Sequence, residues 1–188
     1  MSSRIFIEPL RPIEELLAEA AAADLRATES LTAPSRRREA LAWRAIVRRE
    51  VGRDARIGYD EWGAPVIEDS PLYISVSHSR ASVAVVVGDA PCAIDIESRT
   101  RNFEKVASRY LAAQERALCP HPDFLAVAWC AKECLYKYYR RGGLDLLRDL
   151  HITSVDFARN RICGTILDGA EVEMRIDLRG AEVAVVVA

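Results

Sequence analysis

The chain has 188 residues, of which 50% are hydrophobic and 29% are charged, and its formal net charge is −2 at pH 7. These values are ordinary for a globular protein, so they exclude a disordered chain and a collagen-like repeat. The slightly acidic balance also argues against a general nucleic-acid-binding protein, and we expect no nucleic-acid partner. The length allows one domain or two small domains that pack together.

The sequence shows no membrane-spanning or secretory segment. No apolar run approaches the roughly 20 residues needed to cross a bilayer. The apolar stretch 18–23 is interrupted by Glu19, has further acidic residues on both sides and is followed by no cleavage site. The five cysteines are scattered without a CxxC pair, which gives little support for zinc and predicts reduced thiols. We therefore expect a cytoplasmic protein that does not bind a membrane.

Periodicity and capping signals predict a mixture of helices and strands along the whole chain. The first part predicts a strand, two helices, a turn-rich loop and three strands, at Arg4–Glu8, Pro12–Leu25, Ser35–Val51, Asp60–Pro65, Leu72–Ser77, Ser82–Gly88 and Cys92–Glu97. The second part predicts two helices and four strands, at Phe103–Leu118, Phe124–Arg141, Ile152–Phe157, Ile162–Leu167, Glu171–Asp177 and Glu182–Ala188.

Two Val-rich segments lie one hundred residues apart. Residues 81–88 read ASVAVVVG and residues 181–188 read AEVAVVVA, and each closes a run of helices and strands. Chance recurrence of a Val-rich strand is one explanation; two similar α+β halves are the other, which we favour. The expected halves are residues 1–98 and 99–188, with a small-molecule site in the cleft between them.

The first candidate site segment is Asp95–Ile96–Glu97. Alternate residues of a strand share one face, so both carboxylates project together while Ile96 points into the core. Two convergent carboxylates, completed by water and a substrate phosphate, suit Mg²⁺. Solvated acids at the end of a strand are the alternative interpretation.

The second segment, WCAKECLYK, spans residues 129–137. Trp129, Glu133 and Lys137 share one helix face, and Lys132 lies beside them. A surface ion pair between Glu133 and Lys137 would explain two of these charges without any function. A carboxylate between lysines would instead supply a third metal ligand and a clamp for phosphate.

The third segment is Ser75–Val76–Ser77–His78–Ser79. Its three serines share one face of a strand, and hydroxyls with a histidine at a strand end can hold a phosphate through hydrogen bonds. A polar turn is the alternative. No nucleophile is indicated, because none of these serines lies in a G-x-S-x-G segment.

In this order and at these separations, SVSHS, AIDIE and WCAKECLYK resemble the 4′-phosphopantetheinyl transferase superfamily. The resemblance covers roughly residues 63–137 and favours the larger single-chain class that activates peptide and polyketide synthetases. It implies an α+β fold of two halves related by pseudo-twofold symmetry, and a monomer would suffice for one site. One departure is Ala64 in WGAP, where a lysine is frequent, which puts one contact to coenzyme A phosphate in doubt.

The resemblance implies a role for each matching position. Asp95, Glu97 and Glu133 would hold Mg²⁺, and Lys137 would act on the transferring phosphate or the leaving group. His78, with Ser77 beside it, would contact a coenzyme A phosphate. Glu115 matches a further acidic position. The remaining expected coenzyme A contacts are Lys132 and, from the arginine-rich helix, Arg38 and Arg44 at the 3′-phosphate.

The expected reaction moves 4′-phosphopantetheine from coenzyme A to a serine of an apo acyl or peptidyl carrier protein and releases adenosine 3′,5′-bisphosphate. Glu133, or a water on the metal, would take the serine proton. Such an enzyme would serve fatty-acid or secondary-metabolite biosynthesis. Two alternatives remain open: a Mg²⁺-dependent nucleotide or coenzyme A phosphohydrolase, and a non-catalytic module that binds coenzyme A or the carrier.

Overall fold

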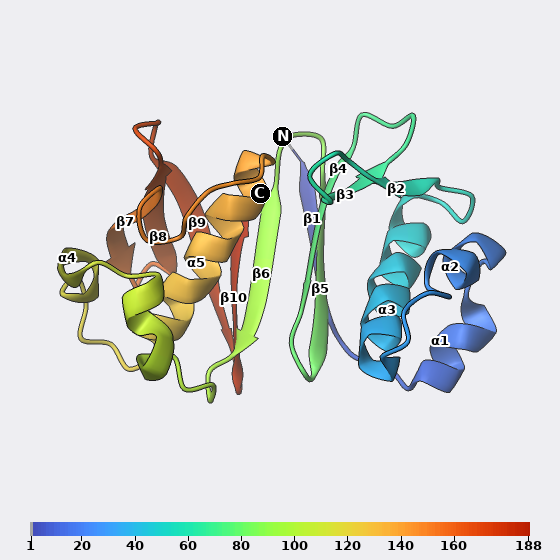
Figure 1. Cartoon of the computed structure of the whole chain (residues 1–188), viewed down its shortest axis with the longest axis horizontal. Coiled ribbons are helices and arrows are strands. Elements are labelled where there is room, and N and C mark those ends of the chain that lie inside the picture. The colour runs from blue at the N-terminus through green and yellow to red at the C-terminus, as the bar shows by residue number, and fades with distance from the viewer. Residues whose placement is uncertain (1) are drawn as a thin grey trace.

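The computed structural model describes residues 2–188, and its elements form the predicted mixture of α and β structure (Figure 1). Within that range the strands form a three-stranded sheet, a five-stranded sheet and a two-stranded hairpin. No helix of these residues is both long enough and apolar enough to span a membrane.

The N-terminal sheet is antiparallel, with β1 (Ser3–Pro9) and β4 (Tyr73–His78) on either side of β5 (Ser82–Gly88). The helix α3 (Pro34–Val51) covers one face of this sheet, and α1 (Ile13–Glu19) and α2 (Ala22–Ala27) pack on α3. The hairpin of β2 (Ile57–Tyr59) and β3 (Pro65–Ile67), not predicted from the sequence, connects α3 to β4.

The C-terminal sheet is also antiparallel and has the order β6-β10-β9-β8-β7. Its strands are β6 (Ala93–Ser98), β7 (Leu150–Asp156), β8 (Arg161–Ile166), β9 (Val172–Arg179) and β10 (Glu182–Val187). The helix α5 (Phe124–Tyr139) covers one face of the sheet. Because β6 pairs with β10, a division of the chain by its sheets falls before Ala93 rather than after Ser98.

The two Val-rich strands are buried on both faces. On β5, Val83 and Val85 face the core under α3, while Ala84 and Val86 belong to a core cluster that lies between the two sheets. Residues one hundred positions later repeat this pattern on β10: 183 and 185 face the core under α5, and 184 and 186 complete the cluster between the sheets. The repeated sequence therefore corresponds to repeated packing, and it holds β6 next to the N-terminal sheet.

Two predicted helices are wrong in extent. The predicted helix 12–25 is divided into α1 and α2, because the backbone is extended at Ala20 and Ala21. This break lets both Leu16 and the buried Asp24 face α3, where Asp24 pairs with Arg44 and with Arg48. Burial of an ion pair thus overrides the high helix propensity of an alanine run.

The predicted helix 103–118 is replaced by a 3₁₀ helix, η1 (Glu104–Arg109), and by the short α4 (Ala113–Arg116). The chain leaves helical conformation at Tyr110, whose side chain is fully buried and donates a hydrogen bond to the Leu125 carbonyl. Glu115 then points inward as well and accepts a hydrogen bond from the Ile152 amide. These buried contacts determine the local geometry of the segment.

An ion pair in the core anchors α5. Lys132 is 0% exposed, and its Nζ lies 2.9 Å from Glu115 Oε2. The same ammonium donates to the carbonyls of Leu146, at 2.9 Å, and Leu150, at 2.7 Å. Burial lowers the pKa of Lys132, and the adjacent Glu115 carboxylate opposes that shift. Lys132 therefore belongs to the core of the C-terminal sheet.

Replacing Lys132 by methionine should destabilise the fold by about 3–5 kcal/mol, because it leaves the Glu115 carboxylate buried without its cation. Urea denaturation measures the loss. The double variant Lys132→Met, Glu115→Leu removes both charges and should recover part of the stability. The exposed Arg175→Gln variant serves as the control. A single variant with unchanged stability would contradict the anchoring role.

Candidate active site

Three acidic side chains gather between β6 and α5. Asp95 and Glu97 lie two residues apart on β6, so they share the face toward α5, and Ile96 is buried between the sheets as predicted. Glu133 comes from α5, and the charges of Asp95 and Glu97 both act on it. We call Asp95, Glu97 and Glu133 the carboxylate cluster.

Asp95 is the most buried member, with 6% of its surface exposed. Its Oδ1 accepts hydrogen bonds from Ser77 Oγ and from Lys137 Nζ, both at 2.7 Å. Its Oδ2 is buried and has no hydrogen-bond partner. A buried carboxylate oxygen without a partner costs free energy, so this atom needs a donor or a cation.

Glu97 and Glu133 carry raised pKa values. Burial is the main cause for both, and the negative charge of Asp95 adds to it. Nearby cations oppose the shifts: chiefly Arg101 at Glu97 and Lys137 at Glu133. The raised pKa values therefore come mainly from the removal of these carboxylates from water, and repulsion by Asp95 is a smaller cause.

Two cations lie at the ends of the carboxylate cluster. Lys137 follows Glu133 by one helical turn and also donates to the Ile94 carbonyl at 3.0 Å. Burial opposes its charge, but Asp95 outweighs burial and raises the pKa of the Lys137 ammonium. At the other end, Arg101 pairs with Glu97. Sequence reasoning missed Arg101, because it lies in the loop after β6, where neither the strand nor the helix period relates it to Glu97.

The serines of SVSHS connect the two sheets. Ser75 Oγ accepts from the Ile94 amide at 3.2 Å, and Ser77 Oγ accepts from the Ile96 amide at 3.3 Å. Ser79 Oγ donates to Glu182 on β10. The Ser77 hydroxyl donates its hydrogen to Asp95. This geometry favours a role in orienting the Asp95 carboxylate over the predicted contact with coenzyme A.

Charged side chains from the start of α3 surround His78, the predicted phosphate contact. Its Nε2 lies 3.2 Å from Glu39 Oε2 and 3.3 Å from an Arg36 guanidinium nitrogen. Burial and the charges of Arg36 and Lys137 lower the pKa of His78, and Glu39 opposes them. Arg38, on the same first turns of α3, is half-buried, and its Nε has no hydrogen-bond partner.

Two predicted coenzyme A contacts are buried and already paired within the protein. Lys132 is enclosed in the core, so it presents no donor to a ligand. Arg44 is 2% exposed, pairs with Asp24 at 3.3 Å and donates to Tyr59 Oη at 3.2 Å. Sequence spacing identified the residue types, but it could not tell an inward lysine or arginine from one that faces a ligand. Neither residue is retained as a contact.

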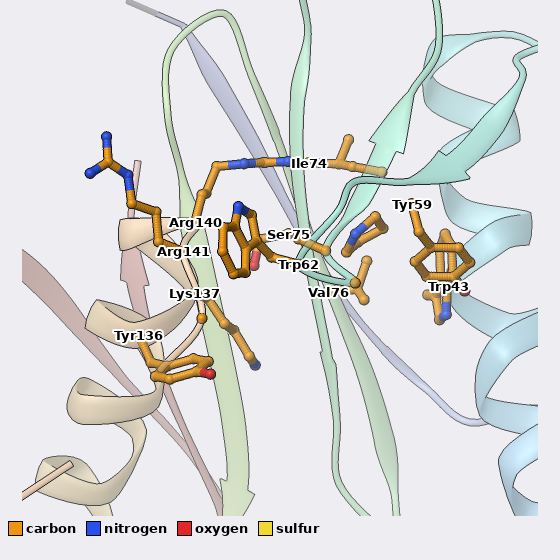
Figure 2. A pocket seen from close by; sticks show the side chains of 14 residues that line it. Trp43, Tyr59, Trp62, Ile74, Ser75, Val76, Tyr136, Lys137, Arg140 and Arg141 are labelled. Atoms are coloured by element: carbon orange, nitrogen blue, oxygen red, sulfur yellow. The ribbon is translucent and has the colours of Figure 1, made fainter. Parts of the chain in front are cut away.

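A cavity of about 310 Å³ lies beside the carboxylate cluster, between the two parts of the chain (Figure 2). One wall comes from the end of α5 and the residues after it, and the other from α3, the β2–β3 hairpin and β4. Trp43, Tyr59 and Trp62 give it an aromatic lining, and Arg140 and Arg141 give it charge. Lys137, which pairs with Asp95, lines it too, so the cavity reaches the Lys137 end of the carboxylate cluster.

The loop that carries Trp62 is tied to α5. Asp60 Oδ1 accepts from the amides of Trp62 and Ala64, and Asp60 Oδ2 accepts from Arg140 at 3.0 Å. A Cβ on Gly142 would lie 2.9 Å from Trp62 Cε3, so the indole packs directly on this glycine. Trp62 is nevertheless 54% exposed, which leaves ring surface open to a ligand. The sequence analysis did not predict this aromatic wall.

Among residues 2–188, no group of three or more His, Cys, Asp or Glu side chains is already arranged to enclose a metal ion. The carboxylate cluster instead holds two ammonium or guanidinium partners and one unpartnered oxygen.

A comparison with known protein families matches the part of the chain that carries the carboxylate cluster. A family model described as the 4′-phosphopantetheinyl transferase superfamily matches residues 91–184, which include β6, α5 and the whole carboxylate cluster. No curated protein matches the chain. The family match covers half of the sequence and spans the residues on which the site is built. The chain therefore belongs to the 4′-phosphopantetheinyl transferase superfamily.

Proposed function

We propose that this protein transfers 4′-phosphopantetheine from coenzyme A to a serine of an apo carrier protein, with Mg²⁺. The observation that carries the proposal is the unpartnered Oδ2 of Asp95, inside a carboxylate cluster at the end of an aromatic cavity with arginines. An acidic cluster needs a cation, and the cavity beside it suits a nucleotide. Family membership supplies the reaction class.

The residues present fit a magnesium ion. Mg²⁺ prefers carboxylate oxygens and commonly takes only a few protein ligands beside water and substrate phosphate. Asp95, Glu97 and Glu133 would supply these oxygens. Burial, and after it the charge of Asp95, raises the pKa values of Glu97 and Glu133, and a dication would favour their charged forms. When bound, Mg²⁺ would neutralise charge on the diphosphate and make its phosphorus a better electrophile.

The aromatic cavity is proposed to hold the adenosine end of coenzyme A. Base–aromatic stacking contributes about 1–3 kcal/mol per base, and Trp62 offers an open ring surface. Arg140 and Arg141 line the same cavity, so either could replace the cation that the family frequently has at Ala64. His78 and Arg38 would take a phosphate at the start of α3, where the helix dipole also favours an anion.

The proposed step is an in-line displacement at the phosphorus that bears pantetheine. The serine oxygen of the carrier forms the new P–O bond, and the bond to adenosine 3′,5′-bisphosphate breaks with its electron pair on the leaving oxygen. Glu133 takes the serine proton in this proposal. Lys137, held by the Ile94 carbonyl and Asp95, stabilises the charge that develops on the leaving group.

Mass spectrometry tests the reaction directly. Incubating the protein with coenzyme A, Mg²⁺ and an apo carrier should add the mass of one phosphopantetheine group to the carrier. Asp95→Asn and Glu133→Gln should reduce the rate by roughly 10²–10⁴, because each removes charge that acts in the transition state. Arg175→Gln is the matched surface control.

The same assay separates the alternatives. Cleavage of coenzyme A without an acceptor would indicate a phosphohydrolase, and binding without turnover would indicate a non-catalytic module. A Glu133→Gln variant with near-normal turnover would remove both roles proposed for Glu133.

Trp62→Ala should raise the KM for coenzyme A roughly 5- to 100-fold, the range that corresponds to one lost stacking contact. The kcat should change little, because the nucleotide contact is present in both the ground state and the transition state. Gly142→Ala should raise the KM as well, since the added Cβ displaces the indole. Leu178→Ala, at an exposed position on β9, is the control. An unchanged KM in Trp62→Ala would exclude stacking on this ring.

Coenzyme A binding should strengthen as the pH falls from about 7.5 to about 6, around the usual pKa of histidine. Burial lowers the pKa of free His78, so the ring is neutral at pH 7, whereas a bound phosphate favours its charged form. Binding therefore takes up a proton. Calorimetry in buffers of different ionisation enthalpy measures that proton. His78→Gln should flatten the dependence, and an identical profile in this variant would refute the phosphate contact.

A further inference from the structure

Arg101 is held at the carboxylate cluster by an aromatic platform. Its guanidinium carbon lies 4.7 Å from the centre of the Trp129 ring and 5.1 Å from that of Phe103. The same guanidinium pairs with Glu97 Oε1. Guanidinium groups stack favourably on indole and phenyl faces, so this platform holds the charge in place without a second carboxylate.

The two cations of the site differ in how firmly they are held. Lys137 has 27% of its side chain exposed and donates to two acceptors, the Ile94 carbonyl and Asp95 Oδ1. Arg101 has 41% of its side chain exposed and pairs with Glu97 alone. Three carboxylates therefore face two cations, and the more exposed cation, Arg101, is held by fewer polar contacts.

We propose that Arg101 is an internal counter-ion that competes with the divalent cation for Glu97. The proposal rests on the metal role given above to Asp95, Glu97 and Glu133. Glu97 Oε1 accepts the Arg101 hydrogen bond in the structure, so a metal ion that uses this oxygen must share it or displace the guanidinium. Arg101 thereby stabilises the empty cluster and weakens its affinity for the metal.

A comparison within the chain shows why this is not an ordinary surface ion pair. Arg116 and Glu104 also form an Arg–Glu pair, but their side chains are 48% and 60% exposed. Glu97 is 23% exposed, and the charge of Arg101 is also among the main influences on the pKa of Glu133. Removing Arg101 should therefore change the charge of the metal site, whereas removing Arg116 should not.

Mn²⁺ binding to the protein without coenzyme A or carrier tests the proposal. Electron paramagnetic resonance of free Mn²⁺ gives the Kd of the wild type, Arg101→Ala, Arg101→Gln, Arg101→Lys and the matched control Arg116→Ala. Arg101→Ala and Arg101→Gln should bind roughly fivefold more tightly, which corresponds to the loss of one partly exposed ion pair. Arg101→Lys should lie near the wild type, and Arg116→Ala should equal it.

Thermal unfolding provides the second measurement. Without metal, Arg101→Ala should melt below the wild type, because the carboxylates repel one another; saturating Mn²⁺ should remove or reverse this difference. A merely structural role for Arg101 would lower the melting temperature in both conditions. Equal or weaker Mn²⁺ binding by both folded neutral variants overturns the proposal. If the wild type binds no Mn²⁺, the metal site itself is overturned. Equal Mn²⁺ binding by the wild type and the variants overturns only the role of Arg101.

Discussion

The carboxylate of Asp95 is the interaction on which the arrangement of the molecule depends. It lies on β6, at the junction between the sheets, and it receives one hydrogen bond from Ser77 on β4 and one from Lys137 on α5. A single oxygen thus joins three elements, two of which belong to different sheets. The second oxygen is buried without a partner. A buried oxygen without a partner costs free energy, so the fold holds this carboxylate at a cost to stability.

The packing around β6 explains how the unpartnered oxygen of Asp95 is tolerated. Ile94 and Ile96 belong to the apolar cluster between the sheets, together with Ala184 and Val186 from β10. These contacts fix the backbone on both sides of Asp95, so the carboxylate cannot turn toward solvent without disturbing a buried core. Hydrophobic burial of the alternate residues thus offsets the free-energy cost of the charge. Successive residues of a strand point to opposite faces. Because Ile94 and Ile96 face the core between the sheets, Asp95 faces the site.

The arrangement of the carboxylate cluster and Lys137 could be predicted from the sequence, because the periods of the strand and the helix determine it. A separation of two residues places Asp95 and Glu97 on one face of a strand, and a separation of four places Glu133 beside Lys137 on a helix. The errors occurred where burial decides the outcome. Lys132 is next to Glu133 in sequence but about 100° away around the helix, and it enters the core. Arg44 likewise pairs inside with Asp24, a partner that no local pattern indicates.

The aromatic cavity was missed for the same physical reason. Trp62 and Gly142 are eighty residues apart, and their contact arises only when the hairpin loop meets the end of α5. The ion pair between Asp60 and Arg140 holds these segments together across the cavity. The cavity and the carboxylate are consequently connected through the end of α5, because Lys137 on its last turn pairs with Asp95 and Arg140, directly after it, lines the cavity. A ligand with both an aromatic base and phosphate groups would engage both ends of this helix surface, which neither a simple anion nor a free base could do.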